Sequence, residues 1–121
     1  MPVQRDFEPE PESAQAVRRF VEGTLAGEPS LDDILLAASE FAANVIRHAR
    51  TTFTVRLISD DDRVRVEVSD GSSIIPAVED LSESYRGLRM IDTVSTRWGV
   101  DATETGKTVW AEFAGSSRRR D

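Results

Sequence analysis

The chain has 121 residues, no cysteine, a formal net charge of -7 and a pI near 4.7. This length fits one domain with a real hydrophobic core. The lack of cysteine excludes disulfides and thiolate metal sites, and the acidic balance argues against a nucleic-acid binder, which needs a basic face for phosphates.

No apolar run approaches the length needed to span a bilayer, and the N-terminal residues lack the apolar core of a signal peptide. We therefore expect a cytoplasmic protein without a membrane partner. Any phosphate-bearing ligand must be held locally, by backbone N–H groups, a metal ion or one or two arginines.

The first elements expected along the chain are a short strand and two helices. The strand is expected at residues 3–7, before an acidic, proline-broken loop. Apolar residues at helical spacing then predict a helix that ends near Gly27. Ser30 and Asp33 have the spacing of a capping box and predict the start of a second helix, which continues to about Ala49.

The second helix carries a polar stripe beside its apolar face. Glu40, Asn44 and His48 are four residues apart, about 400° of rotation and about 6 Å of rise, so they form a slowly drifting row. On the helical wheel Glu40 lies furthest from the apolar centre and His48 nearest to it. A carboxylate and an amide at the rim of a core need partners, such as a hydrated metal ion or a polar ligand. The alternative is a row of solvated surface residues, with a histidine favoured by the helix dipole.

After Arg50 the apolar pattern changes from helical to alternating, which predicts two strands separated by an acidic turn at residues 60–62. In the second strand three valines share one face, and Asp70 continues their parity. A carboxylate at the end of a buried face needs a hydrogen-bond donor or a cation. A hairpin turn at Asp70 and Gly71 is the alternative, which Pro76 disfavours by interrupting the next stretch.

Beyond an irregular loop, helical periodicity returns with Gly87 at the entrance, where backbone N–H groups can approach an anion closely. An ordinary helix start is the alternative there. Two strands follow, around residues 97–100 and 107–113. We expect residues 1–115 to form a single domain and residues 116–121 to form a basic flexible tail.

Gly106, Lys107 and Thr108 imitate the end of a phosphate-binding P-loop. That motif needs a glycine at the position of Asp101 and a helix afterwards, whereas the residues that follow here prefer a strand. We discard a P-loop.

Taken together, four motifs occur in the order of the N, G1, G2 and terminal boxes of the GHKL ATPase superfamily. They are Glu40-x-x-x-Asn44-x-x-x-His48, Asp70, Gly87-Leu88 and Gly106-Lys107-Thr108-Val109-Trp110. Within that superfamily the chain looks most like the small anti-sigma-factor serine kinases of bacterial partner-switching pathways, from about residue 12 to 113. The resemblance implies an α+β Bergerat fold, the histidine kinase-like ATPase fold: a two-layer sandwich with a mixed, mostly antiparallel sheet and helices on one face.

The resemblance implies that the chain binds ATP and Mg²⁺. Asn44 would bind Mg²⁺ through its amide oxygen, which suits a hard cation that bridges phosphates. Asp70 would accept a hydrogen bond from the exocyclic amine of adenine, and Thr108 would support the adenine end. His48 matches its box but is assigned no chemical step.

The resemblance also assigns the phosphate contacts and the catalytic step. Gly87 and Leu88 would offer backbone donors to the phosphates, with Arg86 or Arg89 as the charge partner. Glu40, one turn before the metal ligand, would be the general base that takes the proton from an attacking serine hydroxyl.

The implied function is that of an ATP-binding anti-sigma factor and ATP-dependent protein serine/threonine kinase. It would sequester a sigma factor and phosphorylate a serine on an anti-anti-sigma partner of the STAS type, acting alone or as a homodimer and without direct contact to nucleic acid.

Two alternatives remain open at this point. Ser72 stands at the second glycine position of the usual G1 box, and Tyr85 replaces the first glycine of the G2 box. These changes motivate a GHKL-fold binding module that has lost turnover and acts by sequestering a partner. A detached histidine-kinase catalytic domain is the third possibility, which the short segment between Asp70 and Gly87 disfavours.

Overall fold

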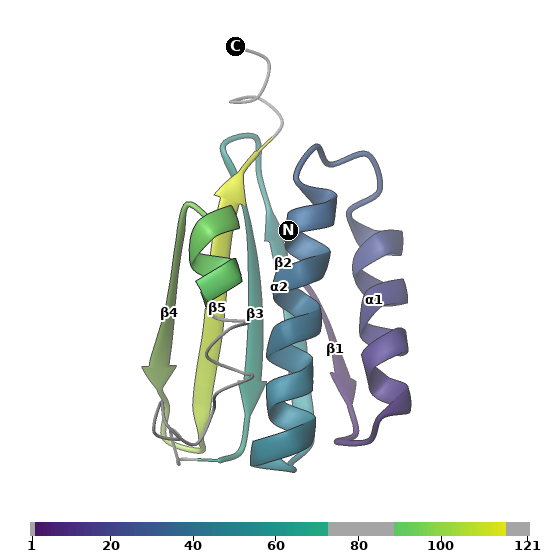
Figure 1. Ribbon diagram of the computed structural model, residues 1–121, viewed down its shortest axis with the longest axis vertical. Helices are drawn as coiled ribbons and strands as arrows, with labels where there is room; N and C mark the ends of the chain where they lie inside the picture. The colour runs from purple at the N-terminus through teal and green to yellow at the C-terminus, as the bar shows by residue number, and fades with distance from the viewer. Residues whose placement is uncertain (1, 73–88, 116–121) are drawn as a thin grey trace.

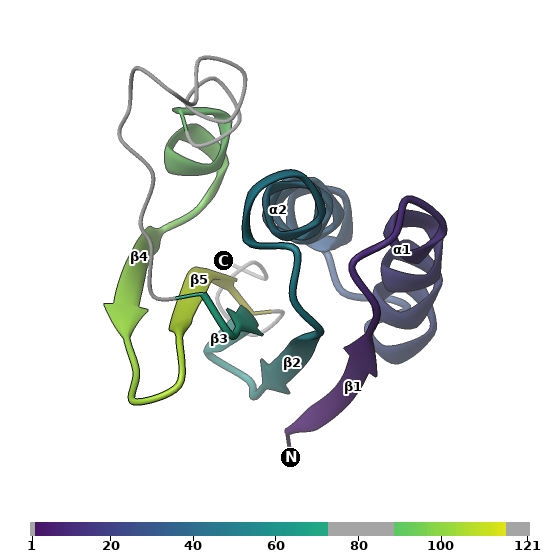
Figure 2. The ribbon, with the colours of Figure 1, turned by 90° about the horizontal axis from the view of Figure 1, so that it is seen from below.

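The computed structural model describes residues 2–72 and 89–115, which form a five-stranded sheet in the order β1-β2-β3-β5-β4 with helices over one face (Figures 1 and 2). All four strand pairings are antiparallel. The expected two-layer α+β architecture is therefore confirmed. The elements are β1 (Val3–Phe7), α1 (Glu12–Thr24), α2 (Leu31–Asn44), η1 (Val45–Ala49), β2 (Phe53–Ser59), β3 (Arg63–Asp70), β4 (Arg97–Ala102) and β5 (Lys107–Ala114).

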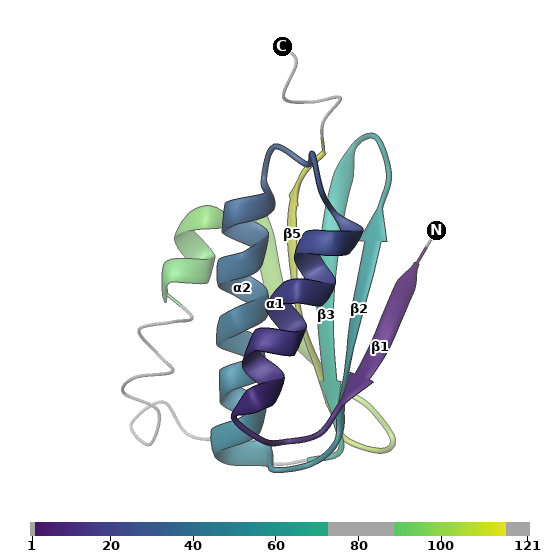
Figure 3. The same ribbon diagram turned by 90° about the vertical axis from the view of Figure 1, so that its right-hand side faces the viewer.

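The hydrophobic core lies between the sheet and the layer formed by α1 and α2, which Figure 3 shows edge-on. Alternate residues of β2 and β3 point into it, and each such apolar side chain contributes about 1.5 to 3 kcal/mol through burial. The core side chains that these strands bury are Phe53, Val55, Leu57, Val64, Val66 and Val68. None of the helices in the described ranges has the length and apolarity to cross a bilayer.

The start of α2 lacks the side-chain cap that the sequence predicts. Ser30 makes no side-chain capping bond. Its hydroxyl instead donates to the carbonyl oxygen of Ala114 at 3.2 Å, and Ser30 is buried. The capping-box prediction with Asp33 is wrong because a contact with the end of β5 takes the serine hydroxyl.

The end of the same helix also departs from the expected α-helix. Regular α-helix stops at Asn44, and Val45–Ala49 form a π-helical turn closed by Arg50 with a φ of 56°. A π turn contains more residues than an α turn, so His48 falls out of phase with Glu40 and Asn44. His48 is exposed, although the α-helical wheel puts it nearest the core.

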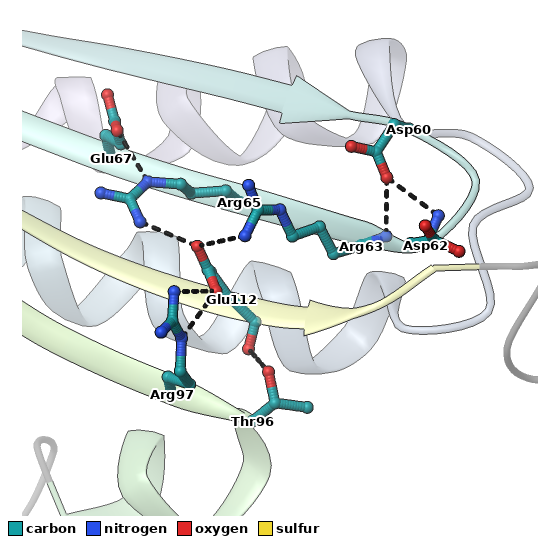
Figure 4. A network of polar contacts seen from close by, with 8 residues as sticks. All are labelled: Asp60, Asp62, Arg63, Arg65, Glu67, Thr96, Arg97 and Glu112. Atoms are coloured by element: carbon teal, nitrogen blue, oxygen red, sulfur yellow. Dashed lines mark hydrogen bonds and ion pairs between the residues drawn. The ribbon is translucent and has the colours of Figure 1, made fainter.

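On the other face of the sheet, three arginines converge on the buried carboxylate of Glu112 (Figure 4). Arg65 and Arg63 donate to its Oε2 at 2.8 and 3.4 Å, and Arg97 contacts its Oε1 at 2.9 Å. The Arg65 guanidinium also lies 4.2 Å from the centre of the Trp110 ring. This network joins β3, β4 and β5 on the face that α1 and α2 leave uncovered.

The network predicts a loss of stability in acid. Burial raises the pKa of Glu112, but the hydrogen bonds from Arg65 and Arg97 outweigh it, so that the pKa lies below its ordinary value of 4.5. The unfolded chain therefore binds more protons than the folded chain just below pH 4.5, and stability falls as the pH drops through the folded-state pKa. We expect Glu112→Gln to lower the free energy of unfolding at pH 7 by on the order of 2 kcal/mol and to flatten its decline in acid.

Urea unfolding between pH 3 and pH 7 measures this effect. The matched control is Glu104→Gln, which changes an exposed acid in the turn between β4 and β5. If the free energies of unfolding of the native protein and Glu112→Gln fell in parallel with pH, Glu112 would not be the source of the loss of stability in acid.

Candidate functional site

Glu40 and Asn44 lie on the flank of α2 that faces away from α1. Arg18 of α1 donates to the hydroxyl of Ser39 at 3.1 Å, so Ser39 marks the flank toward α1. At 100° per residue, Glu40 and Asn44 border the opposite side of the buried stripe. Figure 2 shows the helical residues 89–94 on that opposite side of α2.

The amide oxygen of Asn44 is buried and has no hydrogen-bond partner within the described residues. An unsatisfied buried acceptor costs about 1 to 3 kcal/mol, which a ligand or a cation can remove. The described residues contain no group of three or more histidines and acids that could hold a metal ion by themselves. The Asn44 amide oxygen is the kind of oxygen ligand that a hard cation such as Mg²⁺ prefers, so it fits a cation or a donor group of a ligand.

Asp70 ends β3 on the helix-covered face, as its parity with the valines predicts. Its side chain is only 2% exposed. Its Oδ1 accepts from the ammonium of Lys107 at 3.0 Å and from the backbone N–H of Ser72 at 2.8 Å. Both edges of β3 are occupied by β2 and β5, so the chain does not fold back onto β3 at Gly71.

Ser72 occupies its place without backbone strain. Among the described residues, Arg50 is the one non-glycine residue with a positive φ, so Ser72 does not need the freedom of glycine. The preceding Gly71 donates its N–H to the hydroxyl of Thr51 at 2.9 Å. The serine at this position is therefore compatible with the turn that presents Asp70.

Asn44 and Asp70 lie at the same end of the molecule. Figure 1 shows the C-terminal end of α2, the C-terminal end of β3 and the start of β5 together at the lower edge. Because α2 packs on β3, both residues lie at the end of the helix–sheet interface, and Glu40 lies one helical turn further in. Asn44 and Asp70 therefore lie at the same end of the helix–sheet interface, with Glu40 one helical turn away from Asn44 on α2.

The structure does not bring the side chain of Thr108 to Asp70. Thr108 pairs with Ser69 across β3 and β5, and their hydroxyl oxygens are 2.8 Å apart. Neighbouring residues of a strand point to opposite faces, so Thr108 lies on the face away from the helices. The β5 residue beside Asp70 is Lys107, which belongs to the terminal box but to which the sequence motifs assign no role.

The remaining phosphate-binding candidates, Arg86, Gly87 and Leu88, lie outside the described residues, as does Tyr85. The helix expected there is confirmed for residues 89–94. Its Ile91 is fully buried, and Asp92 accepts from the indole N–H of Trp98 on β4 at 2.9 Å. These contacts attach the helix to the same side of the sheet as α2.

Gly106 precedes β5 and leaves no room for a side chain. A Cβ atom there would collide with the backbone carbonyl of Asp70 and lie 2.8 Å from the Cα of Gly71.

We expect Gly106→Ala to destabilise the fold by about 1 to 3 kcal/mol and to displace Asp70. Thermal unfolding measures the change. Gly23→Ala in α1 is the matched control, because nothing lies within 4 Å of its added Cβ and alanine favours helix; equal stability of the two variants would contradict the expected collision.

Comparison with known proteins identifies the class. The family model of the histidine kinase-like ATPase domain matches residues 7–113, so the chain belongs to that family. This confirms the resemblance to the GHKL superfamily.

The fold is also similar to that in the crystal structure of the RsbU and RsbW domains of Rv1364c from Mycobacterium tuberculosis. The TM-score is 0.75 at 21% sequence identity, and the match covers 95% of this chain and 32% of the other. The chain thus spans about a third of that protein, and the similarity is one of fold. No curated protein matches the sequence.

Proposed function

We propose that the protein is an ATP-binding anti-sigma factor and protein serine kinase that phosphorylates an anti-anti-sigma partner. The observation that carries the proposal is the buried amide oxygen of Asn44, which has no hydrogen-bond partner within residues 2–72 and 89–115 and lies at the same end of the fold as the buried carboxylate of Asp70. Membership of the histidine kinase-like ATPase family and the fold similarity to a chain that contains an RsbW domain support it.

In the proposed site, different residues bind the adenine end and the phosphate end of the nucleotide. Asp70 accepts from the exocyclic amine of adenine, whereas Thr108 lies on the opposite face of the sheet and is not part of the proposed site. Asn44 would hold Mg²⁺, which would offset the charge of the phosphates. Arg86 and the backbone N–H groups of Gly87 and Leu88 contact the phosphates.

Glu40 is the proposed general base. Its carboxylate accepts the proton of a serine hydroxyl on the protein substrate as the serine oxygen bonds to the γ-phosphorus of ATP. The bond from that phosphorus to the bridging oxygen breaks, and ADP leaves. Glu40 is partly exposed and lies on the flank of α2 away from α1, which allows a partner to approach it.

The proposed partners are proteins. This chain sequesters a sigma factor. A STAS-type anti-anti-sigma protein competes with the sigma factor for this chain and is also the substrate of the kinase. The protein acts in the cytoplasm, as a monomer or a homodimer, and residues 1–115 form the functional domain.

The test is incubation of the protein with ATP labelled at the γ-phosphate, Mg²⁺ and a purified STAS-type protein encoded beside it. We expect transfer of the label to one serine of that protein and no transfer when this serine is replaced by alanine. Absence of transfer to any STAS partner, under conditions where ATP binds, would remove the kinase from the proposal.

A second candidate function is a binding module that keeps the fold and sequesters a partner without turnover. The observation in its favour is Tyr85 at a glycine position of the G2 box, where a side chain restricts the backbone that wraps the phosphates. Calorimetry separates the two functions, since the module predicts weak or absent heat on addition of Mg-ATP.

A further inference from the structure

Lys107 and Asp70 form a buried ion pair at the end of the sheet. They are direct cross-strand partners in β3 and β5, on the face that the helices cover. Their side chains are 12% and 2% exposed, and Nζ lies 3.0 Å from Oδ1. Removing one charge from such a pair leaves the other uncompensated in a poorly solvated site, so the two residues act together.

The pair fixes the orientation of the Asp70 carboxylate. The ammonium of Lys107 and the backbone N–H of Ser72 both contact Oδ1. Oδ1 is therefore held from two sides, which restricts the rotation of the carboxylate, and an ionised carboxylate has further acceptor sites for a ligand donor.

A carboxylate held in this way discriminates between purines at one position. The 6-amino group of adenine is a donor and pairs with a fixed acceptor, whereas the 6-oxo group of hypoxanthine presents lone pairs to it. A site built around one polar partner rejects an analogue that leaves this partner unpaired. The discrimination depends on the carboxylate staying in place, which is the contribution of its cation.

We propose that Lys107 is a positioning residue that fixes Asp70 and thereby sets the preference for a 6-aminopurine nucleotide over a 6-oxopurine nucleotide. This inference rests on the proposed function, because it takes Asp70 as the purine-reading residue. Lys107 acts through Asp70 and does not itself contact the base.

The experiment compares the binding of ATP and inosine triphosphate, which differ in the 6-substituent and in the proton that N1 carries, by calorimetry with Mg²⁺. We expect Lys107→Met to weaken ATP binding about tenfold or more and to bring the two dissociation constants to within about threefold of each other. Lys107→Arg keeps a cation beside Asp70 and should retain most of the preference. A role of Lys107 in stability alone would not change the ratio.

Two further variants make the result decisive. Arg65→Met removes a cation from the buried carboxylate of Glu112, on the opposite face of the sheet, and should leave the ratio of ATP to inosine triphosphate affinity unchanged. Asp70→Asn combined with Lys107→Met leaves no buried charge at the pair, so this double variant keeps the test open if Lys107→Met does not fold. It should bind ATP as weakly as Asp70→Asn alone.

The outcomes separate the inference from the proposed function. A native protein that does not bind ATP overturns both. If Asp70→Asn weakens ATP binding about a hundredfold but Lys107→Met keeps the native preference, the role of Lys107 alone is overturned. Binding by the double variant that is clearly weaker than binding by Asp70→Asn would show that Lys107 contacts the nucleotide directly, and would also overturn it.

Discussion

Replacing Asp70 by asparagine is expected to weaken the binding of Mg-ATP and to raise the dissociation constant about a hundredfold above that of the native protein. The substitution keeps the size of the side chain but removes its charge and replaces one acceptor oxygen with a donor group. The adenine amine then loses its acceptor, and Lys107, 3.0 Å away, loses its counter-ion. Calorimetric titration with Mg-ATP measures the change.

The matched control is Asp101→Asn, which neutralises an exposed acid on β4. It should leave ATP affinity unchanged, because it alters the net charge equally without touching the purine site. Circular dichroism of Asp70→Asn establishes that the variant is folded. Native-like affinity in folded Asp70→Asn would show that Asp70 does not recognise the nucleotide.

Replacing Glu40 by alanine is expected to lower the rate of phosphoryl transfer to the protein substrate by about a hundredfold to ten-thousandfold, the usual contribution of a general base. Affinity for Mg-ATP should change less than about threefold, since Glu40 is assigned to the proton of the attacking hydroxyl and Asn44 to the metal ion. Single-turnover transfer of labelled phosphate, together with a calorimetric titration, separates the two effects.

Asp32→Ala serves as the control, because it removes an exposed acid from the first turn of the same helix. It should transfer phosphate at the native rate. If Glu40→Ala transferred phosphate at the native rate, or if it lost ATP affinity and transfer in equal measure, Glu40 would not be the base.

The parts of the fold that follow from local periodicity could be predicted from the sequence. The alternation of Val64, Val66 and Val68 sets the buried face of β3, and the same parity places Asp70 at its end. The helical spacing around Glu40 and Asn44 likewise predicts their position at the border of the core. Both inferences depend only on the periodicity of residues that are close together in the sequence.

The parts that depend on distant contacts could not be predicted in this way. The hydroxyl of Ser30 bonds to Ala114, which lies 84 residues further along the chain, so the local capping signal is overridden. The π turn after Asn44 breaks the assumption of a constant helical period, and it changes the position of His48.

The partner of Asp70 is a similar case. Lys107 meets Asp70 only through the register of β3 and β5, which separates them by 37 residues in sequence. In the sequence, Lys107 stands between a glycine and a threonine that imitate a P-loop, and this local pattern does not indicate which face of the strand Lys107 occupies. The signal that could have found it is the unsatisfied charge predicted for Asp70, since a buried carboxylate needs a cation and a strand neighbour can supply one.

The most direct measurement is a calorimetric titration of the native protein with ATP, in excess Mg²⁺ and again in a chelator. We predict binding in the micromolar range with Mg²⁺ and clearly weaker binding without it, because Asn44 offers its buried oxygen to the metal. Absence of any binding heat from the folded protein, together with an unchanged melting temperature in millimolar Mg-ATP, would contradict the proposed nucleotide site.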